Sequence, residues 1–489
     1  MITLSSLFSS AALEAAHDAA SAHGAHGATI SAGTTYLFTA LLVGLILCLA
    51  FEEKIHAKKS LIAGSFAIVA LALGAALGLL PFDGEAASKG AAPLTNFFGE
   101  RLYHPVFIQG VDWGVIGIIF GASVFVDVSA RSGLFTWIAL RLTRASGGDP
   151  LRLLWAYGLM TVVFSAVLNN VTAMIIVGSL TGVSLDRLGR REQLLSFLLI
   201  EGLLTNVGGL LTLISSVPNL LVGTAAGISF GRFFVVAAPY VLVATVFTLW
   251  FGARVAKIRP LSGERERAEA AAQIAAFEGE GGVEDRGFFF LSAGLLVLFI
   301  ITIAAASALP VVNELGMAFI ALSFAALILW RYKSEVDQFY REVDWDLLGF
   351  FIALFAFINV IEHAQVLALI GEGLQSLIGL GAQVGTGALL VASSAFSSVT
   401  DNIPLAAMLA KILSAQGTPG DSALWWSVIF GANLGGNLTP IGSASTLVAV
   451  TIMHKQGLSM SFGGFVKAAL PFAIAQLALA TAYVLIFLS

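Results

Sequence analysis

Apolar stretches of similar length fill most of this chain and are separated by short polar segments. A helix that crosses the hydrocarbon core of a bilayer needs ~20 predominantly apolar residues. The pattern therefore predicts continuous membrane spans at 32–51, 61–81, 112–131, 233–252, 288–309, 315–331, 344–361 and 464–488. Two longer stretches, 193–230 and 422–453, exceed the length of one such helix at ~1.5 Å per residue. Asn, Gly and Pro interrupt both in the middle, so we predict two broken spans.

Two further apolar segments, 151–187 and 385–415, have a polar centre. The central residues are Asn169, Asn170 and Thr172 in the first segment, and Thr400, Asp401 and Asn402 in the second. Arg152 and Arg187 place basic charge at both ends of the first segment, which favours having both ends on the same side of a membrane. Two half-length helices that meet at a polar tip explain this pattern better than one span does. We predict a re-entrant hairpin in each half.

The second half of the chain repeats the order of the first. Val111-Asp112-Trp113 recurs as Val343-Asp344-Trp345, Asn169-Asn170 as Asp401-Asn402, Asn206-Val207-Gly208-Gly209 as Asn433-Leu434-Gly435-Gly436, and Thr212 as Thr439. Independent matches in a single order indicate a duplicated unit. We therefore divide the chain into a tail at 1–31, a first repeat at 32–253, a linker at 254–287 and a second repeat at 288–489.

The basic residues predict the orientation of these repeats. If the loop at 52–60 is cytoplasmic, all Lys and Arg residues except Lys89, Arg101, Arg232 and Lys411 fall on the cytoplasmic side. This asymmetry is the one that the positive-inside rule describes. Both termini are then extracytoplasmic, and five spans per half turn the second repeat upside down. The expected fold is an all-α polytopic membrane protein with inverted 5+5 transmembrane repeats, in a bacterial-type inner membrane.

Composition agrees with this prediction and excludes several functions. Charged residues make up 11% of the chain, whereas a soluble domain carries roughly 25%, so the lipid bilayer is the expected surrounding. We expect no nucleic-acid partner, because no basic patch extends beyond short loop clusters. The lone Cys48 provides no disulfide framework, and no structural metal site is expected. Without a P-loop or an H-E-x-x-H helix, we expect neither an enzyme nor a cofactor.

The hairpin tips and helix breaks carry the candidate chemistry. Where one half-helix ends and another begins, unpaired C=O and N–H groups carry partial charges of opposite sign. Polar, interrupted segments in matching positions of two halves are typical of a transporter's substrate site. The alternative is that these residues only cap helices and allow close packing. The candidate substrate- or ion-binding residues are Asn169, Asn170, Thr172, Thr205, Asn206, Gly208, Gly209, Thr212, Asn219, Thr400, Asp401, Asn402, Asn433, Gly435, Gly436, Asn437 and Thr439.

Two acidic residues are candidates for proton coupling. Asp401 is a carboxylate at the predicted membrane midplane, where ionisable groups are costly and functional by default. It is suited to bind Na⁺, to carry a proton, or to do both in competition; the alternative is a paired helix cap. Glu201 precedes the first break by little more than one turn and either faces the same cavity or is structural.

The polar motifs of the chain are Leu168-Asn169-Asn170-Val171-Thr172, Asn206-Val207-Gly208-Gly209 with Pro218-Asn219, Thr400-Asp401-Asn402-Ile403-Pro404, and the segment from Gly431 to Ser443. Together they resemble the ion transporter superfamily, in its branch of arsenite permeases and NhaD-type sodium/proton antiporters, which includes the melanosomal P protein. The resemblance implies a homodimer in which a scaffold supports a transport domain that moves like an elevator. The dicarboxylate branch has Ser-Asn-Thr at both tips, which this chain lacks. The antiporter branch often has Asp-Asn at the first tip, where this chain has Asn169-Asn170.

The expected function is secondary active transport of a small inorganic ion by alternating access, with Na⁺ and H⁺ as coupling ions. The best single prediction is a Na⁺/H⁺ antiporter in which Asp401 alternates between cation and proton. One alternative is an arsenite or antimonite efflux permease, because Asn and Thr hydrogen-bond neutral hydroxides. Another is a cation-coupled carboxylate or anion transporter, which a negative Asp401 disfavours. An alternative from a different functional class is an ion channel.

Overall fold

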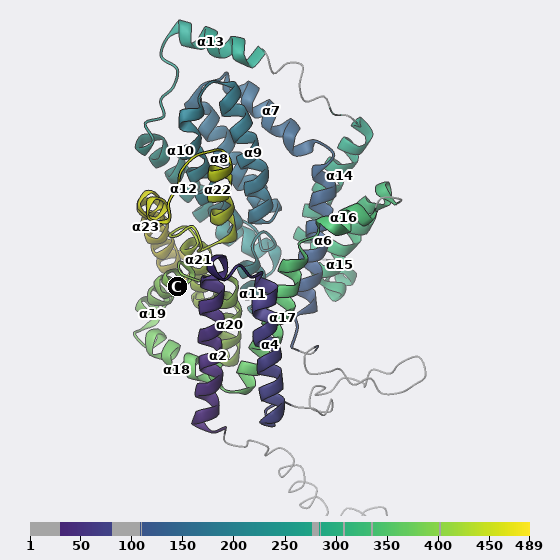
Figure 1. Cartoon of the computed structure of the whole chain (residues 1–489), viewed down its shortest axis with the longest axis vertical. Helices are drawn as coiled ribbons and strands as arrows, with labels where there is room; N and C mark the ends of the chain where they lie inside the picture. Colours follow the sequence, from purple (N-terminus) through teal and green to yellow (C-terminus); the bar gives the residue numbers. More distant parts are fainter. Residues whose placement is uncertain are drawn as a thin grey trace, which may run out of the picture.

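The computed structural model describes residues 30–80, 108, 110–275, 283, 285–306, 309–333, 336–400 and 402–489. Within these ranges all regular structure is helical, and the long helices form two sets in the same order (Figure 1). The first set is α2 (Ala32–Ala50), α4 (Lys59–Ala76), α6 (Trp113–Ala130), α7 (Leu134–Ser146), α8 (Pro150–Val167), α9 (Asn170–Arg187), α10 (Leu194–Gly209), α11 (Val217–Ala225) and α12 (Phe230–Val255). The second set is α14 (Arg286–Ala304), α15 (Pro310–Leu329), α17 (Trp345–His363), α18 (Val366–Ile378), α19 (Ala382–Ser397), α20 (Asn402–Ala415), α21 (Ala423–Gly435), α22 (Ala444–Lys455) and α23 (Phe462–Phe487).

The two sets confirm the predicted fold class. The described residues contain 9 helices long and apolar enough to cross a membrane. One of these is α8, which forms a hairpin with α9; the others are the predicted continuous spans. Each broken span consists of two shorter helices, α10 with α11 and α21 with α22. Residues 1–29 of the predicted tail and most of the loop before α6 lie outside the described residues.

Equivalent capping residues start equivalent helices in the two repeats. The Asp112 carboxylate accepts a hydrogen bond from the Val115 backbone N–H at 3.0 Å, and that of Asp344 accepts one from Leu347 at 3.0 Å. Such a cap satisfies one of the unpaired N–H groups of the first turn. Their position at the start of a span gives Asp112 and Asp344 this local structural role.

Two helix pairs that cross between the repeats form a scaffold. The second span of each repeat packs on the third span of the other, α4 on α17 and α15 on α6. The approach of α6 to α15 is close because Gly121 has no side chain: a Cβ there would lie 2.6 Å from the backbone carbon of Ala321. Small residues allow helices to approach in this way in membranes. The helices α2 and α14 complete this part of the molecule (Figure 1).

The hairpins, broken spans and last spans form a second bundle. Here α8 packs on α10, α19 on α21, and α10 on α22, so that the broken span of each repeat lies against both its own hairpin and the other break. The amphipathic helices α7 and α18 connect this bundle to the scaffold (Figure 1). They begin at equivalent left-handed residues, Gly133 at φ +76° and Gln365 at φ +60°. The bundle brings all the polar interruptions together.

Candidate functional site

The first hairpin tip is a tight turn that begins α9. The Asn169 side chain accepts a hydrogen bond from the Thr172 backbone N–H at 2.8 Å and so caps the helix. Asn170 points the other way, into the bundle. Its Oδ1 accepts from the Ser165 hydroxyl at 2.8 Å, and its Nδ2 donates to Asn206 Oδ1 at 3.3 Å. Of the two neighbouring Asn residues, one therefore closes the tip and the other connects it to the broken span.

The first break is held by side chains that replace missing helical hydrogen bonds. The end of α10 leaves carbonyl groups without a helical donor, as every helix end does. Asn219 Nδ2 donates to the carbonyl oxygens of Gly209 at 2.6 Å and Thr212 at 2.9 Å. The Ser215 hydroxyl donates to the same two carbonyls. These bonds allow non-helical backbone to exist inside the membrane without unpaired polar groups.

Asn206 is the central residue of the buried network. Its Nδ2 donates to Asn437 Oδ1 and to the Ser443 hydroxyl, each at 2.9 Å. Its Oδ1 accepts from Asn170 and, at 3.0 Å, from the Ser445 hydroxyl. An Asn amide has two donors and two acceptor lone pairs, so the hydrogen-bonding capacity of this side chain is fully used. One residue thus connects the first hairpin to the second broken span.

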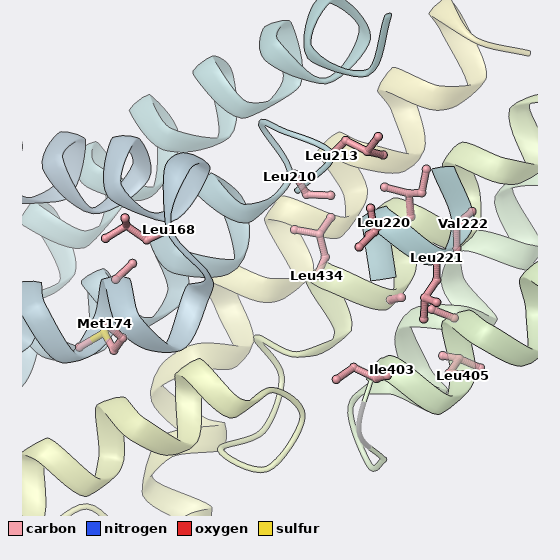
Figure 2. Packing of buried hydrophobic residues seen from close by; sticks show 14 of the residues in the cluster. Leu168, Met174, Leu210, Leu213, Leu220, Leu221, Val222, Ile403, Leu405 and Leu434 are labelled. Carbon is pink, nitrogen blue, oxygen red and sulfur yellow. The ribbon is translucent and has the colours of Figure 1, made fainter. Parts of the chain in front are cut away.

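The repeat equivalent of this residue makes the reciprocal connection. Asn433 donates to Asn219 Oδ1 at 2.8 Å and accepts from the Ser216 hydroxyl at 2.7 Å. Asn206 and Asn433 are repeat partners, and so are Ser216 and Ser443. Each broken span therefore places an Asn against the break of the other repeat. The apolar residues Leu210, Leu220 and Leu434 gather around this crossing (Figure 2).

Four glycines at the breaks allow the elements to approach each other. A Cβ on Gly208 would lie 2.7 Å from the Val162 backbone of α8, and one on Gly435 would lie 2.3 Å from the Ser394 carbonyl oxygen of α19. Gly209 and Gly436 have similarly little room. Backbone atoms have no flexible end that moves aside, so a side chain at Gly208 or Gly435 displaces a helix, whereas the nearest atoms at Gly209 and Gly436 belong to the side chains of Asn170 and Ser443. These glycines act by their small size.

The second hairpin tip is anchored from α21 and from the following break. The Ser397 hydroxyl donates to the Ala432 carbonyl at 2.6 Å, and the Thr439 hydroxyl donates to the Ser398 carbonyl. Thr400 bonds back to Phe396 within its own helix end. Asn402 begins α20 and is buried. Asp401, the sequence's main candidate, lies outside the described residues, so its predicted role stays a prediction.

A cavity of about 650 Å³ lies between the hairpin tips, the breaks and the scaffold. Its lining includes the first residues of four helices of the second bundle: Asn170 to Thr172 of α9, Val217 and Pro218 of α11, Asn402 and Ile403 of α20, and Ala444 and Ser445 of α22. Ser123 and Asp127 of α6 and Leu347 of α17 line the scaffold side. Lys59, Arg131, Asp344 and Asp346 line it where scaffold helices begin or end. Four partial positive charges thus face one space.

The predicted site residues divide into two groups. Asn169, Asn170, Thr172, Asn206 and Asn402 line the cavity. The others lie behind it, in the breaks and the hydrogen-bond network: Thr205, Gly208, Gly209, Thr212, Asn219, Asn433, Gly435, Gly436, Asn437 and Thr439. Thr400 lines a neighbouring space of about 430 Å³ beside Lys59 and Ser443. Glu201 lines neither space and is buried against α9.

Sequence reasoning missed several polar residues of the site. Ser216 and Ser443 occupy equivalent places in the repeats, so the duplication would have identified them. Gln476 of α23 accepts from Asn437 at 2.8 Å and donates to the Thr248 hydroxyl of α12 at 2.8 Å. A single Gln in a long apolar span was the available signal. Lys59, at the start of α4, lines both spaces, and only the packing of the scaffold reveals this.

Comparison with known proteins identifies the family of this architecture. Residues 46–431 match the family CitMHS, described as citrate transporters. The chain belongs to the CitMHS family. Among curated relatives, an uncharacterized transporter of Mycobacterium tuberculosis is 29% identical over 390 residues, covering 78% of this chain and 88% of the relative. The mouse P protein is 24% identical over 532 residues, covering 92% of this chain and 62% of that protein. The predicted superfamily branch is thereby confirmed.

Solved structures share the fold at low sequence identity. The YdaH transporter of Alcanivorax borkumensis gives a TM-score of 0.54 at 13% identity, covering 88% of this chain and 98% of that one. MtrF of Neisseria gonorrhoeae gives 0.53 at 15% identity, covering 93% and 95%. Likeness at this level of identity concerns the fold alone. This CitMHS chain is therefore a membrane transporter with a known type of architecture.

Proposed function

We propose that this CitMHS protein is a secondary active transporter that carries a small carboxylate anion together with a cation. The observation that supports the proposal is the convergence of four helix N-termini on one cavity. Backbone N–H groups and the helix dipole at such ends attract anions, and discontinuous helices in transporters use them to hold anionic substrates. The family description, citrate transporter, agrees with this chemistry.

The groups around the cavity support recognition of a multiply charged anion. The first turn of α11 has no side-chain cap, because the Ser216 hydroxyl donates to Asn433 instead. Pro218 has no N–H and the Leu220 N–H donates to the Ser216 carbonyl oxygen at 3.1 Å. The N–H group of this turn that is left for a ligand at the cavity is therefore that of Val217. On the scaffold side, Lys59 and Arg131 supply positive charges among the carboxylates of Asp127, Asp344 and Asp346. A substrate with carboxylates at both ends matches donors on opposite walls of the cavity.

The division into scaffold and second bundle supports alternating access by an elevator movement. The bundle contains both tips and both breaks, while the opposite cavity wall belongs to α6 and α17. Movement of the bundle along this wall would carry the site across the bilayer. On the predicted topology, Lys59, Arg131 and Asp344 belong to the cytoplasmic side, so the cavity would open there. We further propose that the scaffold forms the interface of a homodimer, in an inner membrane with extracytoplasmic termini.

Sodium/proton antiport is the second candidate. It is favoured by Asp401 beside Asn402 at the second tip, since a carboxylate at membrane midplane suits alternate binding of Na⁺ and H⁺. In the anion proposal the same residue binds the coupling Na⁺. Arsenite efflux is less well supported, because a neutral hydroxide gains little from four helix N-termini.

Transport by purified protein in liposomes tests the proposal. Radiolabelled citrate and succinate are supplied outside, with an inward Na⁺ or proton gradient, and arsenite serves as the neutral competitor. We expect accumulation of a carboxylate that depends on a cation gradient. A pH-sensitive dye reports Na⁺/H⁺ exchange without carboxylate. Exchange in that assay, together with no carboxylate uptake, would favour the antiporter and refute the proposal.

A charge substitution on the cavity wall sharpens the test. Thr172 lies half-buried in the first turn of α9 and lines the cavity. Thr172→Asp stabilises the helix end, because acidic residues suit the first turn, but it places negative charge against the substrate. We expect uptake to fall at least about tenfold, which corresponds to roughly 1.4 kcal/mol of repulsion. Thr172→Val, the matched control for the loss of the hydroxyl, is expected to have a smaller effect.

A further inference from the structure

A carboxyl group lies buried within the bundle, away from the cavity. Glu201 of α10 is fully shielded from solvent. Its Oε1 accepts a hydrogen bond from the Thr181 hydroxyl of α9 at 2.7 Å. Its Oε2 is buried and accepts no hydrogen bond from the part of the chain that the structure describes. A carboxylate oxygen that is left unpaired inside a membrane protein is costly, whereas the neutral acid has a proton there and carries no charge.

The charged side chains of the surrounding elements do not pair with Glu201. Among the helices that pack on α10, the charged groups lie near helix ends: Arg152 of α8, Asp186 and Arg187 of α9, Arg191 and Glu192 of η2 (Arg191–Gln193), Arg232 and Arg254 of α12, and His454 and Lys455 of α22. The described residues of α21 include no titratable group. Tyr157 of α8 is the titratable residue that interacts electrostatically with Glu201.

Glu201 lies between the buried hydrogen-bond network around Asn206 and a second group of hydroxyls. In one direction along α10, little more than one turn away, is Asn206. In the other direction, one turn from Thr181 on α9, the Ser184 hydroxyl is 2.7 Å from the Tyr157 hydroxyl, which is 2.9 Å from that of Thr143. These hydroxyls lead from Glu201 toward the turn between α7 and α8. Hydroxyl groups both donate and accept hydrogen bonds, so such a series is suited to carry protons.

We propose that Glu201 is a proton-binding site that couples a proton to the transported anion, an inference that rests on the proposed carboxylate transport. One proton adds to a Glu201 carboxylate oxygen and is released from the same oxygen to water on the other side. The ionised side chain repels an anion at the nearby helix ends, and the protonated side chain does not. Proton and anion therefore favour each other's binding by the same factor, as linkage requires. Because Glu201 belongs to the bundle with the site, both ligands move together.

Infrared spectroscopy of the purified protein tests the protonation directly. We expect a carbonyl stretch of a neutral carboxylic acid at neutral pH that is absent in Glu201→Gln. Thr181→Val removes the hydrogen bond to this carboxyl and should shift the band without removing it. Glu362→Gln, which alters an exposed carboxylate paired with Lys411, should leave the band unchanged. Absence of a Glu201 band at neutral pH would overturn the inference.

Transport by the same proteins tests the coupling. The measurement is the ratio of citrate accumulation driven by a pH gradient to citrate exchange at equal pH. We expect Glu201→Gln to lower this ratio at least about tenfold, a factor within the usual range for coupling between two binding sites. Glu362→Gln should leave the ratio unchanged. An unchanged ratio in Glu201→Gln would overturn the inference. If the wild type carries neither citrate nor succinate, the proposed substrate fails, and the infrared band alone decides whether Glu201 binds the proton.

Discussion

The connection between the repeats at Asn206 and Asn437 makes a quantitative prediction. These two side chains share one hydrogen bond, from Asn206 Nδ2 to Asn437 Oδ1 at 2.9 Å. They come from different repeats, and both are fully buried. The perturbation is a cycle of the variants Asn206→Ala, Asn437→Ala and the double variant. If the bond holds the two broken spans together, the effects of the single substitutions are not additive.

The structure sets the expected magnitudes. Asn206→Ala removes four hydrogen bonds. Ser443 and Ser445 can still bond to each other, since their hydroxyls are 3.2 Å apart. The buried Asn437 carbonyl oxygen loses its donor, and a buried group left unpaired costs about 1–3 kcal/mol, whereas the half-buried Asn170 amide lines the cavity. The single variant should therefore lose at least about 1–3 kcal/mol, while the shared bond contributes a coupling of about 0.5–1.5 kcal/mol.

Chemical unfolding in mixed micelles measures these free energies. The fluorescence of Trp425 and Trp426, which are buried on the same helix as Asn433, reports the unfolding of this region. The double variant should be destabilised by less than the sum of the two single variants. Pairing Asn206→Ala with Thr302→Ala on α14 is the control, which should be additive to within about 0.5 kcal/mol. Additivity in the Asn206 and Asn437 cycle would refute the bridging role.

Three further predictions concern close packing, support of the network and the second tip. Gly435→Ala places a Cβ 2.3 Å from a backbone oxygen and should destabilise the protein by about 1–3 kcal/mol. The control is Gly294→Ala, which has open space around the new Cβ and should be neutral or slightly stabilising in the same unfolding measurement. Gln476→Leu removes a hydrogen-bond partner of both Asn437 and Thr248. It should raise the KM for the carboxylate more than it lowers the maximal rate, and Thr248→Val should reproduce part of this effect. An unchanged KM would contradict the supporting role of Gln476. Asp401→Asn should abolish the Na⁺ dependence of uptake in liposomes, and transport with unaltered Na⁺ dependence would show that this carboxylate does not bind the coupling ion.

The positions of the helix ends in three dimensions favour a different substrate class from the one that the sequence favours. From the sequence, a carboxylate at one tip favoured a cation as the transported ion. The structure shows that the N-terminal ends of α9, α11, α20 and α22 face the same cavity. Their partial positive charges add where the ligand would lie, and this is the observation behind the proposal of an anionic substrate with a cation as coupling ion. No local pattern contains this information, because the four ends come from distant parts of the chain.

The sequence by itself determined the architecture. The lengths of its apolar segments predicted the spans, and the recurring Asn and Gly predicted the duplication, the hairpins and the breaks, because lipid allows polar, irregular backbone only in protected places. Tertiary structure alone decided which polar groups meet. The pairing of Asn206 with Asn437 and the bond from Gln476 to Thr248 depend on how helices from opposite repeats cross, and the bond between Thr181 and Glu201 depends on how α9 packs on α10. Such contacts are set by packing in three dimensions, and spacing along the chain does not encode them.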